Sequence, residues 1–328
     1  MQIPPIYTIT PQMLALIAEI EAERIYFSQL TLPSGLKEKV QRVSLLKSSL
    51  FSARIEGNPL EISDLSSGKK DEEKKREVFN LLEAVHFVDV HLRKGPIKKE
   101  ALLELHGRVL KNISSNAGYF RREVNAIFNQ AGVAVYMPPP PSAIPQLLER
   151  LLGYINKETE DFPLVIAFIS HLVFEKIHPF LDGNGRIGRL LIAAVLKAKG
   201  WDFTFTVPFE EYLDEHKEEY YFHLDKGLKE TDDYLLFMLT AFSQEIQKIK
   251  EQIKEELAKK EEAFLPPRQE EIYNIIKDHV VCSFDMIRRR FLQVPARTLR
   301  YDLKKLLDRG LIEKSGETRG RYYRVKGV

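Results

Sequence analysis

Apolar residues recur every three or four positions through most of residues 1–260, the spacing that predicts amphipathic helices. In the first such segment, residues 11–28, the apolar positions are Leu14, Ile17, Ile20 and Ile25. The same spacing predicts helices over residues 36–55, 71–93, 98–112, 142–157, 163–176, 186–199, 209–227 and 232–262, with a loop over residues 59–70. We therefore expect a mainly α protein, built as a helical bundle.

Residues 122–135 depart from this helical spacing. Val124, Ile127 and Phe128 lie before the polar stretch 129–132, and two valines follow it. Short apolar runs on both sides of a glycine-containing turn predict a β-hairpin. The proline run 138–141 is then expected to act as a rigid spacer between the hairpin and the next helix.

The last 60 residues show a different order of elements after the linker Pro266-Pro267. The pattern predicts helices over Gln269–Lys277, Ser283–Arg290 and Arg297–Asp308, followed by strands over residues 311–314 and 321–325. Three helices and a two-stranded wing resemble a winged helix-turn-helix. We therefore divide the chain into a helical region 1–95, a core 96–262 and a winged-helix domain 263–328.

Charge is distributed unevenly between these regions. Residues 266–328 hold fifteen Lys/Arg against eight Asp/Glu, whereas the rest of the chain is acidic by five charges. A basic end on an acidic body is typical of nucleic-acid binding. DNA contacts are expected from the third helix and the wing, through Arg297, Arg300, Lys304, Arg319 and Arg321. A winged helix that contacts protein, with these charges solvated, is the alternative.

The cysteine content and the hydropathy bear on location. Cys282 is the only cysteine, which excludes an internal disulfide and favours a reducing compartment. We find no run of about twenty apolar residues and no basic stretch followed by an apolar core at the N-terminus. A cytoplasmic protein without membrane contact is expected. An apolar seam at Ile246, Ile249, Ile253 and Leu257, together with the winged helix, is compatible with a homodimer.

The run from His178 to Arg189 carries the most chemistry: His-Pro-Phe-Leu-Asp-Gly-Asn-Gly-Arg-Ile-Gly-Arg. A glycine-rich turn that opens a helix leaves free backbone N–H groups at the positive end of the helix dipole, where phosphate binds readily. Arg186 and Arg189 lie three apart and share one helix face. Asp182 is a candidate ligand for Mg²⁺, and His178 is a candidate general base.

This run resembles the signature of the Fic family, His-Pro-Phe-x-Asp/Glu-Gly-Asn-Gly-Arg-x-x-Arg, at every fixed position. The resemblance implies transfer of AMP from ATP to a Ser, Thr or Tyr hydroxyl of a protein, with release of pyrophosphate. It places Mg²⁺ on Asp182 and the phosphates on Gly183, Asn184, Gly185, Arg186 and Arg189, with His178 taking the hydroxyl proton. It further places Tyr220 and Tyr221 near the nucleotide base. Gly118-Tyr119-Phe120-Arg121 and the hairpin resemble the flap that holds the target by strand addition.

A second motif lies at the end of the helix over residues 36–55. Glu56 is expected at the negative end of this helix, where a carboxylate is disfavoured without a nearby cation, and Gly57 is the natural cap. Ser52, Glu56 and Gly57 resemble the inhibitory motif Ser/Thr-x-x-x-Glu-Gly/Asn of Fic proteins. The resemblance implies that Glu56 engages Arg189 and prevents it from binding the γ-phosphate.

Three functions remain open from the sequence. The first is a self-inhibited protein AMP-transferase that modifies a hydroxyl on another protein or on itself. The second is a nucleotide-sensing, DNA-binding transcriptional regulator. The third is an enzyme that removes AMP, in which Glu56 orients a water molecule. Another nucleotide or a phosphocholine donor is also compatible with the motif.

Overall fold

A computed structural model describes residues 1–66, 71–93, 95–128, 134–157, 162–263, 265–279, 282–315 and 322–326. The chain forms two compact units, Met1–Ile253 and Lys254–Val328. The division falls inside one helix, α11 (Thr231–Ala263), which begins in the first unit and ends in the second. The separate domain boundary expected at residue 95 stays a prediction.

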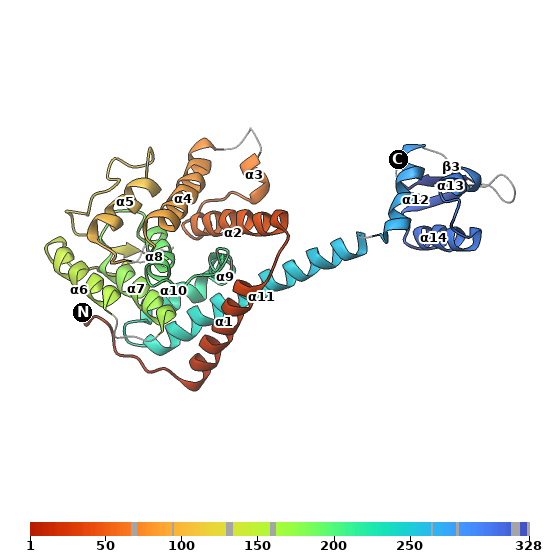
Figure 1. Ribbon diagram of the computed structural model, residues 1–328. Helices are drawn as coiled ribbons and strands as arrows, with labels where there is room; N and C mark the ends of the chain where they lie inside the picture. Colours follow the sequence, from red (N-terminus) through yellow and green to blue (C-terminus); the bar gives the residue numbers. More distant parts are fainter. Residues whose placement is uncertain are drawn as a thin grey trace. The chain divides into compact units, whose positions relative to one another are not determined.

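The first unit is helical, as the apolar spacing predicted (Figure 1). Besides the first part of α11, its helices are α1 (Pro11–Gln29), α2 (Ser34–Ile55), α3 (Ile62–Ser66), α4 (Glu72–His91), α5 (Lys99–Val109), the 3₁₀ helix η1 (Pro141–Ala143), α6 (Ile144–Asn156), α7 (Pro163–Ile177), α8 (Asn184–Ala198), α9 (Glu210–Glu215) and α10 (Lys217–Lys226). Helix α7 is buried almost all round, which makes it the centre of the unit, and it packs against α6 and α8.

Some expected details of these helices are wrong. The loop over residues 59–70 contains the short helix α3, and the single helix over 209–227 is two helices that meet at His216, whose φ of −117° interrupts the helix. In α1, Ile17 and Ile20 are buried, but Leu14 and Ile25 are 50% and 45% exposed. Met13 and Phe27 take their places in the core because the buried face is rotated from the one expected.

The expected hairpin is present between α5 and η1. Strand β1 (Ile127–Phe128) pairs antiparallel with β2 (Ala134–Tyr136), with a bulge between the two residues of β1. The turn at residues 129–133 lies outside the described residues. Strand β2 is tied to the core because the Tyr136 hydroxyl donates to the Lys176 carbonyl of α7 at 2.9 Å. This contact places the hairpin next to the end of α7.

The second unit contains the expected helices and strands and one strand more. Its elements are α12 (Pro267–Asp278), β3 (Cys282–Ser283), α13 (Phe284–Arg290), α14 (Ala296–Asp308), β4 (Ile312–Ser315) and β5 (Tyr322–Val325). The strands form an antiparallel sheet in the order β3-β5-β4. The unit has its own core, in which Ile272, Leu299 and Leu303 are almost completely buried. Its assignment as a winged helix-turn-helix stays a prediction.

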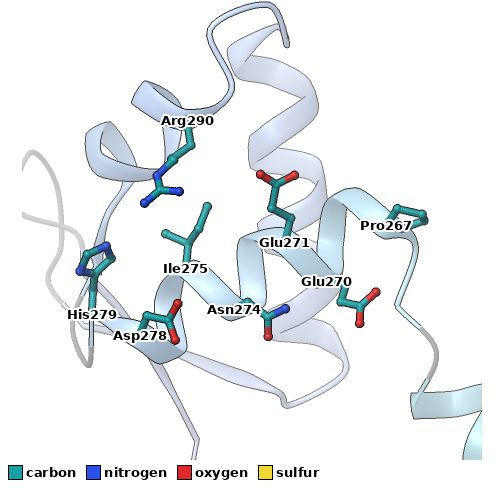
Figure 2. A pocket seen from close by; sticks show the side chains of 8 residues that line it. All are labelled: Pro267, Glu270, Glu271, Asn274, Ile275, Asp278, His279 and Arg290. Atoms are coloured by element: carbon teal, nitrogen blue, oxygen red, sulfur yellow. The ribbon is translucent and has the colours of Figure 1, made fainter.

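Three acidic residues of this unit lie on α12 beside a groove. This groove of about 330 Å³ is lined by Glu270, Glu271, Asp278 and His279, with Arg290 of α13 on its other side (Figure 2). The basic residues of α14 do not line this groove. The acidic residues that line the groove therefore lie on a different helix from Arg297, Arg300 and Lys304.

Candidate active site

The turn between α7 and α8 holds the residues of the 178–189 run in a fixed shape. His178 ends α7 in the left-handed region with φ 49°, and Gly183 precedes α8 with φ 80°. The side chain of Asn184 accepts from the Phe180 N–H and donates to the Phe180 carbonyl, each at 2.9 Å. The Asn184 side chain therefore holds the turn in shape, and its contribution to phosphate binding stays a prediction. The backbone N–H groups at the start of α8 stay available as donors.

His178 is held from behind by Arg121. The buried Arg121 guanidinium donates from Nε to the His178 carbonyl at 2.7 Å, from NH1 to the Glu123 carbonyl at 3.0 Å and from NH2 to the Pro139 carbonyl at 2.5 Å. One side chain thus ties the turn to both ends of the hairpin segment. Burial lowers the pKa of His178 to about 4, so its imidazole is neutral at pH 7 and can accept a proton.

Asp182 lies at the surface of the turn and His106 lies beneath it. His106 Nδ1 accepts from the Gly118 N–H at 2.8 Å, so the ring proton is on Nε2, which donates to the Asp182 carbonyl at 3.1 Å. The His106 ring also stacks on Phe180 at 3.7 Å between centroids. The Asp182 carboxylate is 64% exposed, and its contacts with the Gly183 N–H and with Arg186 both use Oδ1. An exposed carboxylate with Oδ2 outside these contacts fits a Mg²⁺ ligand.

The second arginine of the run is held by the end of α2. Arg189 is 1% exposed and donates from Nε to the Ser52 hydroxyl at 3.0 Å and from NH2 to the Ser52 carbonyl and to Glu56 Oε1, both at 2.8 Å. Burial is the largest single influence and disfavours the Arg189 charge, but Glu56, Tyr220 and Tyr221 together outweigh it and raise the pKa of the guanidinium. The contact implied by the resemblance is therefore present, and Gly57 has the expected positive φ of 95°.

Glu56 also lies directly against the first turn of α8. A Cβ added at Gly185 would collide with Glu56 Oε1 and would lie 3.2 Å from Arg189 NH1. Gly185 is thus the residue that lets the carboxylate approach the helix start so closely. The Glu56 carboxylate occupies the positive end of α8, where an anionic ligand would otherwise bind.

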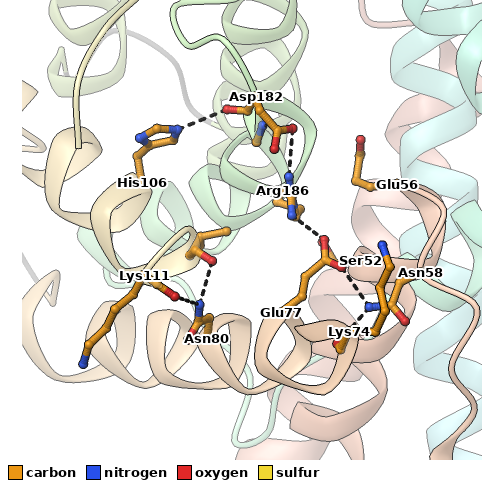
Figure 3. A network of polar contacts seen from close by, with 12 residues as sticks. Ser52, Glu56, Asn58, Lys74, Glu77, Asn80, His106, Lys111, Asp182 and Arg186 are labelled. Atoms are coloured by element: carbon orange, nitrogen blue, oxygen red, sulfur yellow. Dashed lines mark hydrogen bonds and ion pairs between the residues drawn. The ribbon is translucent and has the colours of Figure 1, made fainter. Parts of the chain in front are cut away.

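The first arginine of the run meets a different carboxylate, Glu77 of α4 (Figure 3). Arg186 forms an ion pair from NH1 with Glu77 Oε1 and another from NH2 with Asp182 Oδ1 at 2.9 Å. The second oxygen of Glu77 accepts from Asn58 Nδ2 at 2.8 Å. Asn58 follows Glu56 by two residues. The end of α2 and the residues after it therefore supply both the carboxylate that holds Arg189 and the amide that holds Glu77.

The two tyrosines expected near a nucleotide base lie in unequal positions. Tyr220 is fully buried, and its hydroxyl lies 2.8 Å from Nε2 of His171 in the core. Tyr221 is 43% exposed, and its hydroxyl donates to the Ile55 carbonyl at 3.1 Å. A base contact stays a prediction for Tyr221, whereas the burial of Tyr220 leaves it no surface in this structure for a ligand.

The expected DNA-contact residues fall partly within the described chain. Arg297, Arg300 and Lys304 are exposed on α14, and Tyr301 between them is 58% exposed. Arg300 is held 4.8 Å above the Phe284 ring. Arg319 and Arg321 lie outside the described residues.

Three residues of the site were missed in the sequence: Glu77, His106 and Arg121. Glu77 had a detectable signal, because it stands among the buried positions of α4, next to Val78 and one turn before Leu81. Arg121 was part of the quoted Gly-Tyr-Phe-Arg segment, but its target, a set of backbone carbonyls, has no sequence pattern. His106 gave no pattern with another residue, since it acts through two backbone groups.

Comparisons with known proteins place this site in context. Residues 96–196 match the model of the Fic/DOC family. The chain is 28% identical over 198 residues to the protein adenylyltransferase Fic of Drosophila willistoni, covering 56% of this chain and 38% of that protein. It is 30% identical over 207 residues to the Culex quinquefasciatus protein of the same name, covering 59% and 39%. The chain thus spans about two fifths of the length of these curated relatives.

Solved structures show a similar fold. A Fic family protein from Desulfovibrio desulfuricans aligns with a TM-score of 0.73 at 23% identity, covering 99% of this chain and 98% of that one. A fragment of Fic-1 from C. elegans aligns with a TM-score of 0.62 at 22% identity, covering 74% and 73%. Within the part of the chain that the structure describes, no helix has the length and hydropathy to cross a bilayer.

Proposed function

The chain belongs to the Fic/DOC family, and we propose on that premise that it transfers AMP from ATP to a hydroxyl group of a protein side chain. The observation that carries this proposal is the grouping of His178, Asp182, Arg186 and Arg189 around the first turn of α8. Positioning and charge neutralisation supply most of the rate in transfers of this kind. The target is a protein with a Ser, Thr or Tyr hydroxyl, which includes this chain itself.

In the proposed reaction the hydroxyl oxygen attacks the α-phosphorus of ATP and its proton passes to the neutral imidazole of His178. The bond from the α-phosphorus to the oxygen that bridges to the β-phosphate breaks, and pyrophosphate leaves. The amide of Gly185 and the guanidinium groups of Arg186 and Arg189 balance the phosphate charge, and the amide of Gly183 joins them once it leaves Asp182 Oδ1. Mg²⁺ held by Asp182 would neutralise the polyphosphate when bound.

Glu56 keeps the enzyme inactive in this proposal. Its carboxylate holds Arg189 and lies against Gly185, the two places where the phosphates would bind. AMP transfer then requires that Glu56 move away from α8. The contact of Tyr221 with the Ile55 carbonyl supports the end of α2 in the closed position.

A transfer assay with ATP labelled on the α-phosphate tests both assignments. We expect weak labelling by the unmodified protein, stronger labelling by Glu56→Gly and none by His178→Ala, since general-base catalysis is worth about 10² to 10⁴ in rate. Equal labelling by the three proteins would contradict the proposal.

A second function is proposed for the second unit, which we assign as a winged helix-turn-helix that binds duplex DNA through α14. The supporting observation is the row of exposed side chains Arg297, Arg300, Tyr301 and Lys304, on a different helix from the acidic groove of α12. Arg319 and Arg321 would add contacts from the wing, and a homodimer would present two such helices. We propose a cytoplasmic location for the protein, where DNA is accessible to it.

Electrophoretic mobility shifts across salt concentrations test DNA binding. Changing both Arg297 and Arg300 to Ala should weaken binding and reduce its salt dependence, because phosphate contacts release counterions. The matched control is Lys277→Ala, which removes a basic residue from α12 and should leave binding unchanged. No shift of any duplex at low salt would contradict this second function.

A further inference from the structure

Glu77 is fixed more firmly than any surface carboxylate of the site. Its Oε1 is paired with Arg186 NH1, and its Oε2 accepts from Asn58 Nδ2 at 2.8 Å. Asn58 is itself anchored, since the same Nδ2 donates to the Lys74 carbonyl at 2.9 Å and its Oδ1 accepts from the Leu60 N–H at 3.1 Å. Both oxygens of Glu77 are therefore held by groups that are held in turn (Figure 3).

Burial separates this contact from the one made by Glu56. The side chains of Glu77 and Arg186 are 10% and 5% exposed, whereas the Glu56 side chain is 28% exposed. Glu77 lies inside α4, which packs along α8, so it cannot withdraw from Arg186 unless the two helices separate. Glu56 lies at the end of α2, where the chain turns at Gly57.

The direction of the Arg186 side chain follows from this anchor. Glu77 binds the NH1 nitrogen of Arg186 in the interior. The NH2 nitrogen of Arg186 reaches Asp182 at the surface, 2.9 Å away. Arg186 Nε is buried without a partner among the described residues, so the ion pair with Glu77 and the contact with Asp182 set the orientation of the group. A planar guanidinium that is fixed on one edge presents the other edge in a defined direction.

We infer that Glu77 is a positioning residue, which aligns Arg186 toward the phosphates of the nucleotide and does not inhibit the enzyme. This inference rests on the proposed AMP transfer for its activity readout, but not for its binding readout. Glu56 and Glu77, the two carboxylates that contact the α8 arginines, then have opposite effects on the reaction. Removal of Glu56 should increase transfer, and removal of Glu77 should decrease it.

The test uses the full-length chain with Glu56→Gly as the active background. Adding Glu77→Gln should lower kcat/KM for ATP about 10²-fold, the scale of loss when a binding group is misplaced by about 1 Å. Binding of a fluorescent ATP analogue in EDTA should weaken about tenfold, which measures the arginine contact without metal or turnover. Glu83→Gln is the matched control, because it makes the same change on an exposed part of α4.

A double-mutant cycle separates positioning from a general loss of structure. If Glu77 acts through Arg186, then Glu77→Gln added to Arg186→Ala should cause no further loss of analogue binding. Should Glu77→Gln fail to fold, Glu77→Asp provides the same comparison with the charge retained and the reach shortened. Unchanged or increased analogue binding and kcat/KM, or additive losses in the cycle, would overturn the inference. Failure of Glu56→Gly to transfer AMP would instead count against the proposed function, with the binding cycle still informative.

Discussion

The two arginines of α8 are one helical turn apart and meet carboxylates of different kinds. Arg189 is held by Glu56 from the end of α2, and Arg186 is held by Glu77 from within α4. In both cases a carboxylate from a distant part of the chain binds an arginine that is itself a candidate phosphate ligand. The difference lies in the setting: Glu56 is partly exposed at a helix end, whereas Glu77 is buried between two helices.

This difference separates a contact that can open from one that cannot. Both arginines are buried, but Glu56 is partly exposed and can be solvated when it leaves, so losing this contact costs about 1.5–3 kcal/mol, while breaking the pair with the buried Glu77 costs about 3–5 kcal/mol. The other ties of α2 to the core are also partly exposed: Lys47 lies 2.8 Å from Glu211, and Arg54 lies 3.0 Å from Asp214. The last turn of α2 is itself buried at Ser52, Ala53 and Ile55, so the partly exposed Glu56 side chain, and not the helix, is the part that can move away from Arg189.

The free energy of unfolding should show the largest difference between the two contacts. Glu77→Gln removes the charge from a buried pair and should lower this free energy by about 3 kcal/mol. Glu56→Gln removes a partly exposed carboxylate, and the buried Arg189 keeps its two contacts with Ser52, so it should lower this free energy by only about 1.5 kcal/mol. Urea unfolding followed by circular dichroism measures both. Equal losses would show that the two contacts do not differ as described.

Removal of the inhibitory carboxylate should give the next largest effect. Glu56→Gly frees Arg189 and the start of α8, and it should raise AMP transfer about 10- to 100-fold, the value of one charge-assisted hydrogen bond of about 1.5–3 kcal/mol. Initial rates at saturating ATP measure the gain. Ser52→Ala should raise transfer less than Glu56→Gly, because Arg189 loses only the Ser52 hydroxyl and keeps its hydrogen bonds to the backbone carbonyl of residue 52 and to Glu56. A rate unchanged by Glu56→Gly would remove the basis for inhibition.

Asn58 joins the two regions and should have an intermediate role. Asn58→Ala removes the bonds to Glu77, to the Lys74 carbonyl and to the Leu60 N–H, while Glu77 keeps its ion pair with Arg186 and Glu56 keeps its contact with Arg189. The turn after α2 should loosen, and basal transfer should rise about fivefold, as expected for a net loss of about 1 kcal/mol. The same labelling assay applies, with Glu83→Gln as the control. A decrease in transfer would instead assign Asn58 to the alignment of Arg186.

The pH dependence should be the weakest effect. Burial lowers the pKa of His178 to about 4, so the neutral base is present above that pH and is lost only below it. Glu56 raises this pKa and Arg121 lowers it, so Glu56→Gly should lower it further. The kcat/KM of Glu56→Gly should therefore show no loss from His178 between pH 8 and pH 6. A decline centred near 6.5, the ordinary histidine value, would contradict the buried setting.

The sequence was most informative where local rules apply. Apolar spacing predicted the helices, Gly57 was predicted as the cap at the end of a helix, and the Gly183 turn was predicted from its glycine-rich sequence ahead of an apolar helix. The pairing of Glu56 with Arg189 came from a motif resemblance and not from spacing. The break at His216 was missed because no proline or glycine marks it.

The rest depends on tertiary packing. Glu77 and Arg186 are 109 positions apart, and only the packing of α4 on α8 brings them together. The bonds between the Asn184 side chain and the Phe180 backbone were not predicted, because they are a property of the folded turn. Exposure of Leu14 and Ile25 was missed for a related reason, since the apolar spacing of α1 does not say which neighbour it packs against.

Intact-mass analysis of purified protein incubated with ATP and Mg²⁺ tests the central claim most directly. We predict that Glu56→Gly gains the mass of one AMP group, that the unmodified chain gains little, and that Glu56→Gly with Glu77→Gln gains far less than Glu56→Gly alone. If the unmodified chain and Glu56→Gly are modified to the same extent, or if Glu77→Gln increases the modification, then the opposite roles of the two carboxylates are contradicted.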